Sequence, residues 1–389
     1  MIKLMKSTFY HEAKSKKALA QFIVSAQKLS MGEECKKFEQ DFAEKQGRKF
    51  AVLVNSGSSA NLILIQALIN LGRLKKDDGV GVSAVTWSTN IMPLLQLGLR
   101  PMLMDCELET LNVSSAILEK YLVGHKALFL TNVLGFCSDI KQIQDLCSER
   151  GIILLEDNCE SLGSKTNGQL LGNFSLAATF SFYVGHHIST VEGGMVVTDE
   201  EELYDMLVMV RAHGWDRQLK ADKQKQLTQE YSIDDFFKPY TFYELAYNVR
   251  PTEITGWLGN YGLKYWDEIV ERRKNNFKKF NQALTGNSEL QAMEVEYMET
   301  ISNFAMPVLV REKSFFKKYI ERFNKEKVEI RPIIAGNIAE HPFYKKNVKT
   351  QALSLPNATK VHSQGFYFPN HPELTTNEVN LLTNLIAKP

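Results

Sequence analysis

The chain has 389 residues, 44% of them apolar, and a formal net charge of +1. A net charge this close to zero shows no basic excess of the kind that binds nucleic acid. No apolar run approaches the roughly 18 residues of a membrane span. Residues 1–17 lack the apolar core of a signal peptide. We therefore expect a cytoplasmic protein whose partners are neither nucleic acids nor membranes.

Along the first two-thirds of the chain, helical and strand patterns alternate. Residues 33–47 place Cys35, Phe38 and Phe42 on one helical face, and Gly47 ends the helix. Seven short apolar runs then predict strands, at 49–56, 79–87, 100–107, 126–135, 152–159, 177–184 and 193–199. Helical patterns separate the first five runs, which implies a mostly parallel sheet with helices on both faces. The last two strands follow each other without a helix, so we expect an antiparallel edge.

From about residue 200 the pattern changes. Residues 201–215 are helical, residues 217–235 are polar and predict a loop, and residues 258–284 predict one long helix.

A smaller mixed unit follows this long helix. Its predicted strands and helices are, in chain order, 303–310 (strand), 314–327 (helix), 328–334 (strand) and 377–387 (helix). We therefore expect two domains, a large α/β domain at 1–265 that includes the N-terminal helix and a small α/β domain at 266–389.

The cysteines give no sign of a metal site. There are five: Cys35, Cys106, Cys137, Cys147 and Cys159. None is close enough to another to form the C-x-C or C-x-x-C pairs that zinc and iron–sulfur ligands normally show. We expect reduced, buried cysteines and no metal.

Residues at strand ends are where chemistry is sought, because ligands of open α/β sheets bind beyond the carboxyl ends of the strands. Gly57 and Ser58, in NSGSSAN, open a helix and could hold a phosphate or simply cap the helix. Asp157 emerges from a buried strand and could pair with a cationic ring nitrogen or cap the next helix. Trp87 ends the second predicted strand and could stack on a planar cofactor or belong to the core.

Taken together and in this order, these residues with Ser181 and the turn at 186 form a family pattern. The chain resembles the sugar aminotransferases of the DegT/DnrJ/EryC1/StrS family, which use pyridoxal phosphate. The resemblance extends over essentially the whole chain and includes YNVRPTEITGWLG at 247–259. It implies the aspartate aminotransferase-like fold (fold type I) and a homodimer with shared active sites.

The resemblance also implies which residues bind pyridoxal phosphate. The phosphate would be held by Gly57, Ser58 and Ser181 and by Asn248 from the second subunit. Trp87 would stack on the ring, Asp157 would pair with the ring nitrogen, and Glu160 would lie near the ring hydroxyl. By pairing with the protonated nitrogen, Asp157 would keep the ring an electron sink.

Position 186 departs from the family pattern. The family carries a lysine there that bonds covalently to the cofactor, whereas this chain carries His186, followed by His187. No lysine lies between Lys165 and Lys220. An imidazole does not form the stable bond that a lysine forms with an aldehyde, but it accepts and donates protons near neutral pH.

The two histidines and the EGG turn at 192–194 resemble the dehydratase branch of the family. That branch implies an enzyme in which His186 helps remove the C3 hydroxyl of a nucleotide-linked 4-keto-6-deoxyhexose. It also implies pyridoxamine phosphate as cofactor, L-glutamate as amine donor and ammonia as product. The implied substrate is the GDP-linked mannose derivative of colitose synthesis for lipopolysaccharide O-antigen. Its implied contacts at the dimer interface are Arg217, Tyr240 and Arg250.

Three alternatives stay open at this point. An iron–sulfur-dependent branch acting on CDP-sugars also carries histidine, but it needs clustered cysteines. An ordinary sugar aminotransferase needs the missing lysine. A non-catalytic nucleotide-sugar sensor predicts loss of the cofactor residues, whereas Trp87, Asp157 and Ser181 are present.

Overall fold

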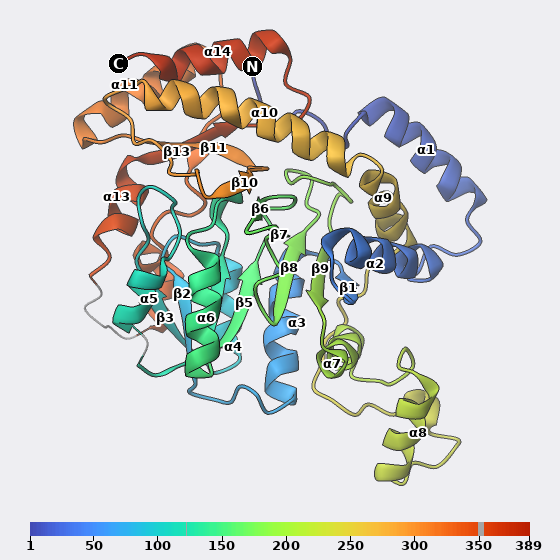
Figure 1. Ribbon diagram of the computed structural model, residues 1–389. Coiled ribbons are helices and arrows are strands. Elements are labelled where there is room, and N and C mark those ends of the chain that lie inside the picture. Colours follow the sequence, from blue (N-terminus) through green and yellow to red (C-terminus); the bar gives the residue numbers. More distant parts are fainter. Residues whose placement is uncertain (122, 349–353) are drawn as a thin grey trace.

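A seven-stranded mixed sheet forms the centre of the computed structural model, which describes residues 1–121, 123–348 and 354–389 (Figure 1). Across the sheet the strands are β1 Phe50–Val54, β9 Gly194–Thr198, β8 Ala177–Ser181, β5 Ile153–Asp157, β4 His125–Thr131, β2 Gly79–Ser83 and β3 Arg100–Met104. Each falls within one of the seven apolar runs, apart from the first residue of β4. The five strands from β8 to β3 are parallel, as the alternating pattern predicts.

The antiparallel strand lies inside the sheet rather than at its edge. β9 pairs antiparallel with both β8 and β1, so β1 is the edge strand. The direct loop from β8 to β9 can join antiparallel neighbours only, because parallel neighbours need a long crossover. No local pattern in the sequence predicts that β1 pairs with the far side of β9.

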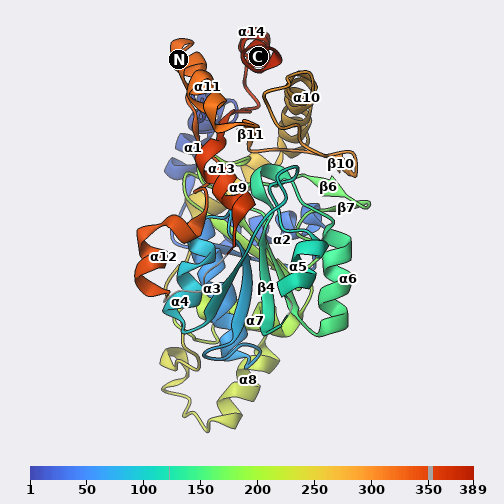
Figure 2. The ribbon, with the colours of Figure 1, turned by 90° about the vertical axis from the view of Figure 1, so that its left-hand side faces the viewer.

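Helices cover both faces of this sheet (Figure 2). They are α2 Glu33–Gln46, α3 Gly57–Asn70, α4 Met92–Gln96, α5 Ser115–Tyr121, α6 Ile140–Arg150 and α7 Glu201–Arg211. In α2 the predicted apolar face, Cys35, Phe38 and Phe42, is buried, and Gly47 ends the helix with a φ of 80°. A positive φ at this cap is the conformation that glycine adopts without strain.

The smaller unit consists of a three-stranded antiparallel sheet and four main helices, all within residues 266–389. These elements are α10 Trp266–Thr285, β11 Ala305–Leu309, α11 Lys313–Lys325, β12 Arg331–Pro332, α13 Pro356–Gln364, β13 Gly365–Pro369 and α14 Thr376–Ala387. The strand predicted at 328–334 is only two residues long, because Pro332 has no N–H to continue the ladder. A further short sheet joins the two parts of the chain, where β10 Met298–Thr300 pairs with β6 Lys165–Thr166.

Two helical predictions are wrong in detail. The loop predicted at 217–235 contains a helix, α8 Ala221–Glu230, that has no buried residue. It therefore shows no apolar period, although its Ala, Lys, Gln, Leu and Glu residues are good helix formers. The long helix predicted at 258–284 is two helices, α9 Glu253–Leu263 and α10, separated at Lys264–Tyr265.

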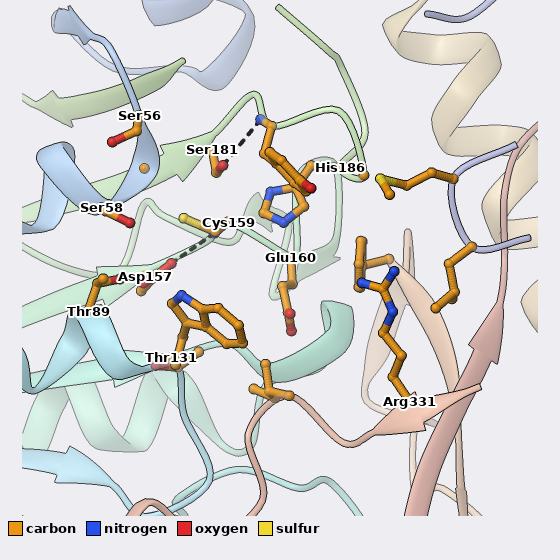
Figure 3. Close-up of a pocket in the computed structure, with 18 of the residues that line it drawn as sticks. Ser56, Ser58, Thr89, Thr131, Asp157, Cys159, Glu160, Ser181, His186 and Arg331 are labelled. Carbon is orange, nitrogen blue, oxygen red and sulfur yellow. Dashed lines mark hydrogen bonds between the residues drawn. The ribbon is translucent and has the colours of Figure 1, made fainter. Parts of the chain in front are cut away.

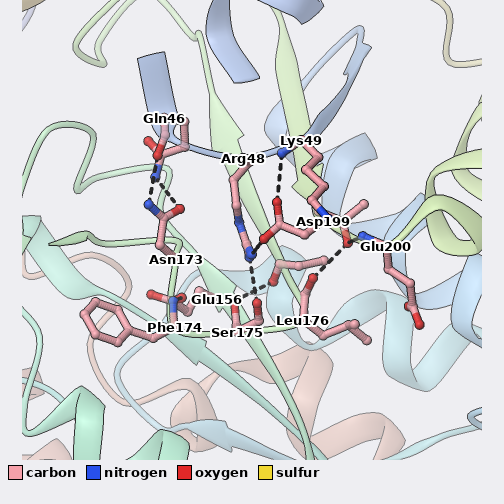
Figure 4. A network of polar contacts seen from close by, with 12 residues as sticks. Gln46, Arg48, Lys49, Glu156, Asn173, Phe174, Ser175, Leu176, Asp199 and Glu200 are labelled. Atoms are coloured by element: carbon pink, nitrogen blue, oxygen red, sulfur yellow. Dashed lines mark hydrogen bonds and ion pairs between the residues drawn. The ribbon is translucent and has the colours of Figure 1, made fainter. Parts of the chain in front are cut away.

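At the amino ends of β1 and β8, a polar network fastens the strands together (Figure 4). Arg48 donates to the carboxylate of Asp199 at 2.6 Å and to the carbonyl of Ser175 at 2.6 Å. The fully buried carboxylate of Glu156 accepts from the amide of Phe174 at 3.0 Å. The contacts of Arg48 fix the amino ends of β1 and β8, whereas ligands of open α/β sheets bind beyond the carboxyl ends of the strands. No helix in the described residues is long and apolar enough to cross a membrane.

Candidate active site

A cavity of about 270 Å³ lies beyond the carboxyl ends of the parallel strands (Figure 3). Lining it are His186 and six of the residues expected to bind the cofactor, namely Gly57, Ser58, Trp87, Asp157, Glu160 and Ser181. The positions follow directly from the topology, because these residues end or follow β1, β2, β5 and β8. We call this set of seven residues the cavity wall.

One side of the cavity is the N-terminus of α3. Ser56 caps this helix by accepting from the amide of Ser59 at 3.1 Å. At Gly57 an added Cβ would lie 2.7 Å from the Cβ of Ser181 and 3.1 Å from the sulfur of Cys159, so the backbone and Ser181 approach too closely for any other residue. Free amides, a helix dipole and the nearby serine hydroxyls are suited to bind a phosphate.

The carboxylate of Asp157 is fixed and nearly buried, with 4% of its surface exposed. One oxygen accepts from the amides of Asn61 at 2.9 Å and Asn90 at 2.8 Å, and the other accepts from the main-chain N–H of Cys159 at 2.9 Å. All three donors are neutral. Within the described residues Asp157 forms no ion pair, so its charge is available to a cationic group in the cavity.

Glu160 lies beside Asp157 in the cavity. Its pKa is raised to about 7, mainly by burial and also by the charge of Asp157, while a hydrogen bond from the amide of Leu134 at 2.9 Å opposes the rise. Glu160 can therefore hold or release a proton near neutral pH.

His186 lies in the loop between β8 and β9, with its imidazole between two aromatic rings. Tyr183 and Phe304 contact it edge-on, with centroids 5.9 Å and 5.2 Å away. The pKa of His186 is lowered to about 4, mainly by burial; the charge of Asp157 and the carbonyl of Ser181 oppose this shift, and the charge of Arg273 makes a smaller contribution to it. The imidazole is therefore neutral at pH 7. Its Nδ1 is buried without a hydrogen-bond partner in the described residues, and the side chain lines the cavity.

His187 does not line this cavity. Its Nε2 lies 2.7 Å from the carbonyl oxygen of Ser302, and because a carbonyl only accepts, this nitrogen carries the proton. Burial holds the pKa of His187 well below its usual value. His187 therefore holds the turn to the main chain at Ser302, while His186 lines the cavity.

The remaining predicted residues lie outside the cavity, in residues 212–250, which we call the outer segment. Arg217 stacks on Trp215 with 3.9 Å to the ring centroid and donates to the carbonyl of Pro239 at 2.8 Å. Tyr240 is 73% exposed. Asn248 accepts from Arg250 at 3.0 Å. Figure 1 shows α8, which this segment includes, projecting away from the central sheet. Within one chain these residues do not join the cavity wall.

Several cavity residues were not predicted from the sequence. Arg331 and Tyr367 come from the smaller sheet, Met5 comes from the N-terminal segment, and Glu192 from the EGG turn. Glu192 alone had a local signal, since it stands in a motif that the sequence analysis singled out. For the others, access to the cavity depends on how distant parts of the chain pack, which no local pattern encodes. No group of three or more metal-ligating side chains occurs in the described residues.

Comparisons with known proteins agree on one family. A profile described as the DegT/DnrJ/EryC1/StrS aminotransferase family matches residues 11–386. GDP-4-keto-6-deoxy-D-mannose 3-dehydratase of Yersinia pseudotuberculosis is 35% identical over 378 residues, which cover 95% of this chain and 94% of the relative.

Two solved structures extend the comparison to the fold. The Escherichia coli GDP-4-keto-6-deoxy-D-mannose 3-dehydratase with bound hydrated PLP is 34% identical, with a TM-score of 0.86 and 96% coverage of both chains. A structure of GDP-4-keto-6-deoxymannose 3-dehydratase with a trapped PLP–glutamate geminal diamine is also 34% identical, with a TM-score of 0.88 and coverage of 96% of this chain and 97% of the other. The expected aspartate aminotransferase-like α/β fold is thus confirmed.

Proposed function

The chain belongs to the DegT/DnrJ/EryC1/StrS aminotransferase family, and we propose that within it the protein is a 3-dehydratase of a nucleotide-linked 4-keto-6-deoxyhexose. It uses pyridoxamine phosphate, and L-glutamate restores the amine of the cofactor. The relatives described above support this proposal, because they carry that activity in their names and one holds PLP joined to glutamate.

The residues of the cavity wall fit this cofactor. Because Gly57 has no Cβ, Ser181 packs closely against the N-terminus of α3, and the amides and hydroxyls gathered there suit a phosphate. Asp157 presents a carboxylate held by neutral donors, which suits a pyridinium N–H. When bound, the cofactor supplies an amine for a ketone and a ring that accepts an electron pair. Gly57, Ser58 and Ser181 would hold its phosphate, and Trp87 its ring.

One observation carries the choice between dehydration and amino transfer: a histidine, not a lysine, occupies the turn beside the cavity. No lysine is among the described residues that line it. Without a lysine, the described lining of the cavity offers no amine that could displace an amino sugar from the cofactor and so release it as product. The neutral imidazole of His186 can instead take a proton and return it to a departing hydroxyl.

The overall reaction balances without a metal or a separate reductase. Carbon C3 of the sugar loses its hydroxyl and gains a hydrogen, glutamate is oxidised to 2-oxoglutarate, and its nitrogen leaves as ammonia. In this scheme Asp157 holds the charge of the ring nitrogen, Glu160 holds or releases a proton near neutral pH, and His186 moves the proton.

The proposal includes GDP as the nucleotide, a cytoplasmic role in colitose-type O-antigen synthesis, and a homodimer with shared sites. Exposed aromatic and aliphatic side chains of the outer segment support the dimer, among them Phe236 at 81%, Tyr240 at 73% and Leu245 at 76% exposure. A second copy that covers them would bring Arg217, Asn248 and Arg250 to a neighbouring cavity.

The proposed function is tested with purified protein, pyridoxamine phosphate, L-glutamate and a panel of GDP-, CDP- and TDP-linked 4-keto-6-deoxy sugars. We expect ammonia, 2-oxoglutarate and a 3-deoxy-4-keto sugar, formed fastest from the GDP-linked mannose derivative. An amino sugar that retains the nitrogen would refute dehydration, and a requirement for a reduced iron–sulfur protein would favour the other dehydratase branch.

A further inference from the structure

A buried arginine lies behind the turn that carries His186. Arg273 is in the first half of α10 and is only 1% exposed. Its guanidinium donates to four main-chain carbonyls and to no carboxylate in the described residues. The acceptors and their distances are Asn370 at 2.7 Å, Phe304 at 2.8 Å, Asn303 at 3.3 Å and His186 itself at 3.5 Å.

These four carbonyls belong to three separate segments of the chain. Asn303 and Phe304 precede β11, Asn370 follows β13, and His186 lies in the loop between β8 and β9. Phe304 also packs its ring against the imidazole of His186. One guanidinium thus joins the smaller unit to the loop that carries the proposed base.

The guanidinium also places an unpaired positive charge next to His186. Burial lowers the pKa of Arg273 to about 9, which still leaves it protonated at neutral pH. Asp157 and Arg273 act on the imidazole with opposite sign, and the neutral His187 follows it in the turn. The other titratable or charged side chains in the described lining of the cavity are Cys159, Glu160, Tyr183, Glu192, Arg331 and Tyr367.

We propose that Arg273 is a positioning residue for His186: its guanidinium fixes the main chain of the catalytic turn against the smaller unit, and its positive charge opposes protonation of the imidazole. The proposal rests on the proposed function for the role of His186, but the geometry and the charge effect do not depend on which substrate is bound.

The test uses the full chain labelled in its histidines, with His186 assigned by comparison with His186→Asn, and follows the imidazole by NMR as the pH is lowered. Arg273→Gln keeps a hydrogen-bond donor and removes the charge, so we expect His186 to titrate at a higher pH than in the wild type. Arg273→Lys keeps the charge but loses the guanidinium N–H groups that bind the four carbonyls. His186 should therefore keep its low titration midpoint, while kcat falls several-fold and KM changes little.

Arg272→Gln is the matched control, because Arg272 precedes Arg273 on α10 but is half-exposed and pairs with Glu268. It should match the wild type in both measurements. The proposal is overturned if Arg273→Gln leaves the titration of His186 where the control has it, or if Arg273→Lys keeps the wild-type kcat. If Arg273→Gln does not fold, the kcat of Arg273→Lys tests the proposal. Because the titration needs no substrate, failure of the proposed dehydration would leave it interpretable.

Discussion

The cavity wall and the outer segment differ in how far one chain completes them. In the wall, Asp157 is 4% exposed and bound by three donors, and His186 is flanked by two rings. In the outer segment Tyr240 is 73% exposed, and Arg217 stacks only on its own neighbours. The difference indicates that one chain preorganises the groups proposed for chemistry, whereas the residues proposed for substrate contact lie outside the cavity.

The strongest test of the wall is His186→Asn, which removes the proposed base. We expect dehydration to fall about 10²–10⁴-fold, the usual contribution of general acid–base catalysis. Ammonia release with the GDP-linked substrate measures it. His187→Asn is the control, and its effect should be milder because His187 bonds to Ser302 and does not line the cavity. An inactive His187 variant beside an active His186 variant would reverse the two assignments.

Asp157→Asn should have the next largest effect. Removing the charged acceptor should weaken cofactor binding by about 1.5–3 kcal/mol, or roughly 10–150-fold. Equilibrium titration of the apoprotein with pyridoxamine phosphate measures this. Asp199→Asn, in the network at the opposite end of the sheet, should bind the cofactor as the wild type does. Equal affinity in all three proteins would mean that Asp157 only orders the polar groups around it.

Burial of His186 also predicts a dependence of stability on pH. Its pKa is lowered from 6.5 to about 4 in the folded protein. The contribution of the neutral His186 side chain to the free energy of unfolding is therefore fully present above pH 6.5. As the pH falls from there towards 4, the unfolded chain binds a proton that the folded chain does not. The free energy of unfolding should fall by up to about 1.4 kcal/mol per pH unit from this group. Denaturant titrations of the apoprotein should show a shallower fall in His186→Asn; identical slopes would contradict the burial of its neutral form.

Mixed dimers test the outer segment. His186→Asn and Arg217→Ala should each be impaired alone, because one damages the wall and the other the proposed contact from the partner. After the two are mixed and allowed to exchange subunits, about a quarter of the sites should combine two intact halves. Activity should rise towards that fraction of the wild type. No recovery, despite proven exchange, would place both residues in the site of the same chain.

Sequence reasoning reached those parts of the molecule whose signals are local. The seven strands, the helix opened by Gly57 and the acidic residue that ends β5 all follow from short-range patterns and from the rule that parallel strands end at one edge. α8 escaped notice because a helix that buries nothing has no apolar period. Arg331 and Arg273 escaped notice because their roles depend on how α10 and the smaller sheet pack against the large one, which is a property of the tertiary structure alone.

The pairing of β9 between β1 and β8 sets an order of assembly during synthesis. Phe50 pairs with Thr198, and Gly57 meets Ser181, so both contacts span well over a hundred residues of chain. Strand pairings of such long range form late, because the loop between them must close first. Until β9 has been synthesised, β1 has no neighbour in the sheet, and the two sides of the proposed phosphate site stay apart. A nascent chain truncated before residue 194 should therefore retain no affinity for the cofactor, although it already contains Gly57, Asp157 and His186.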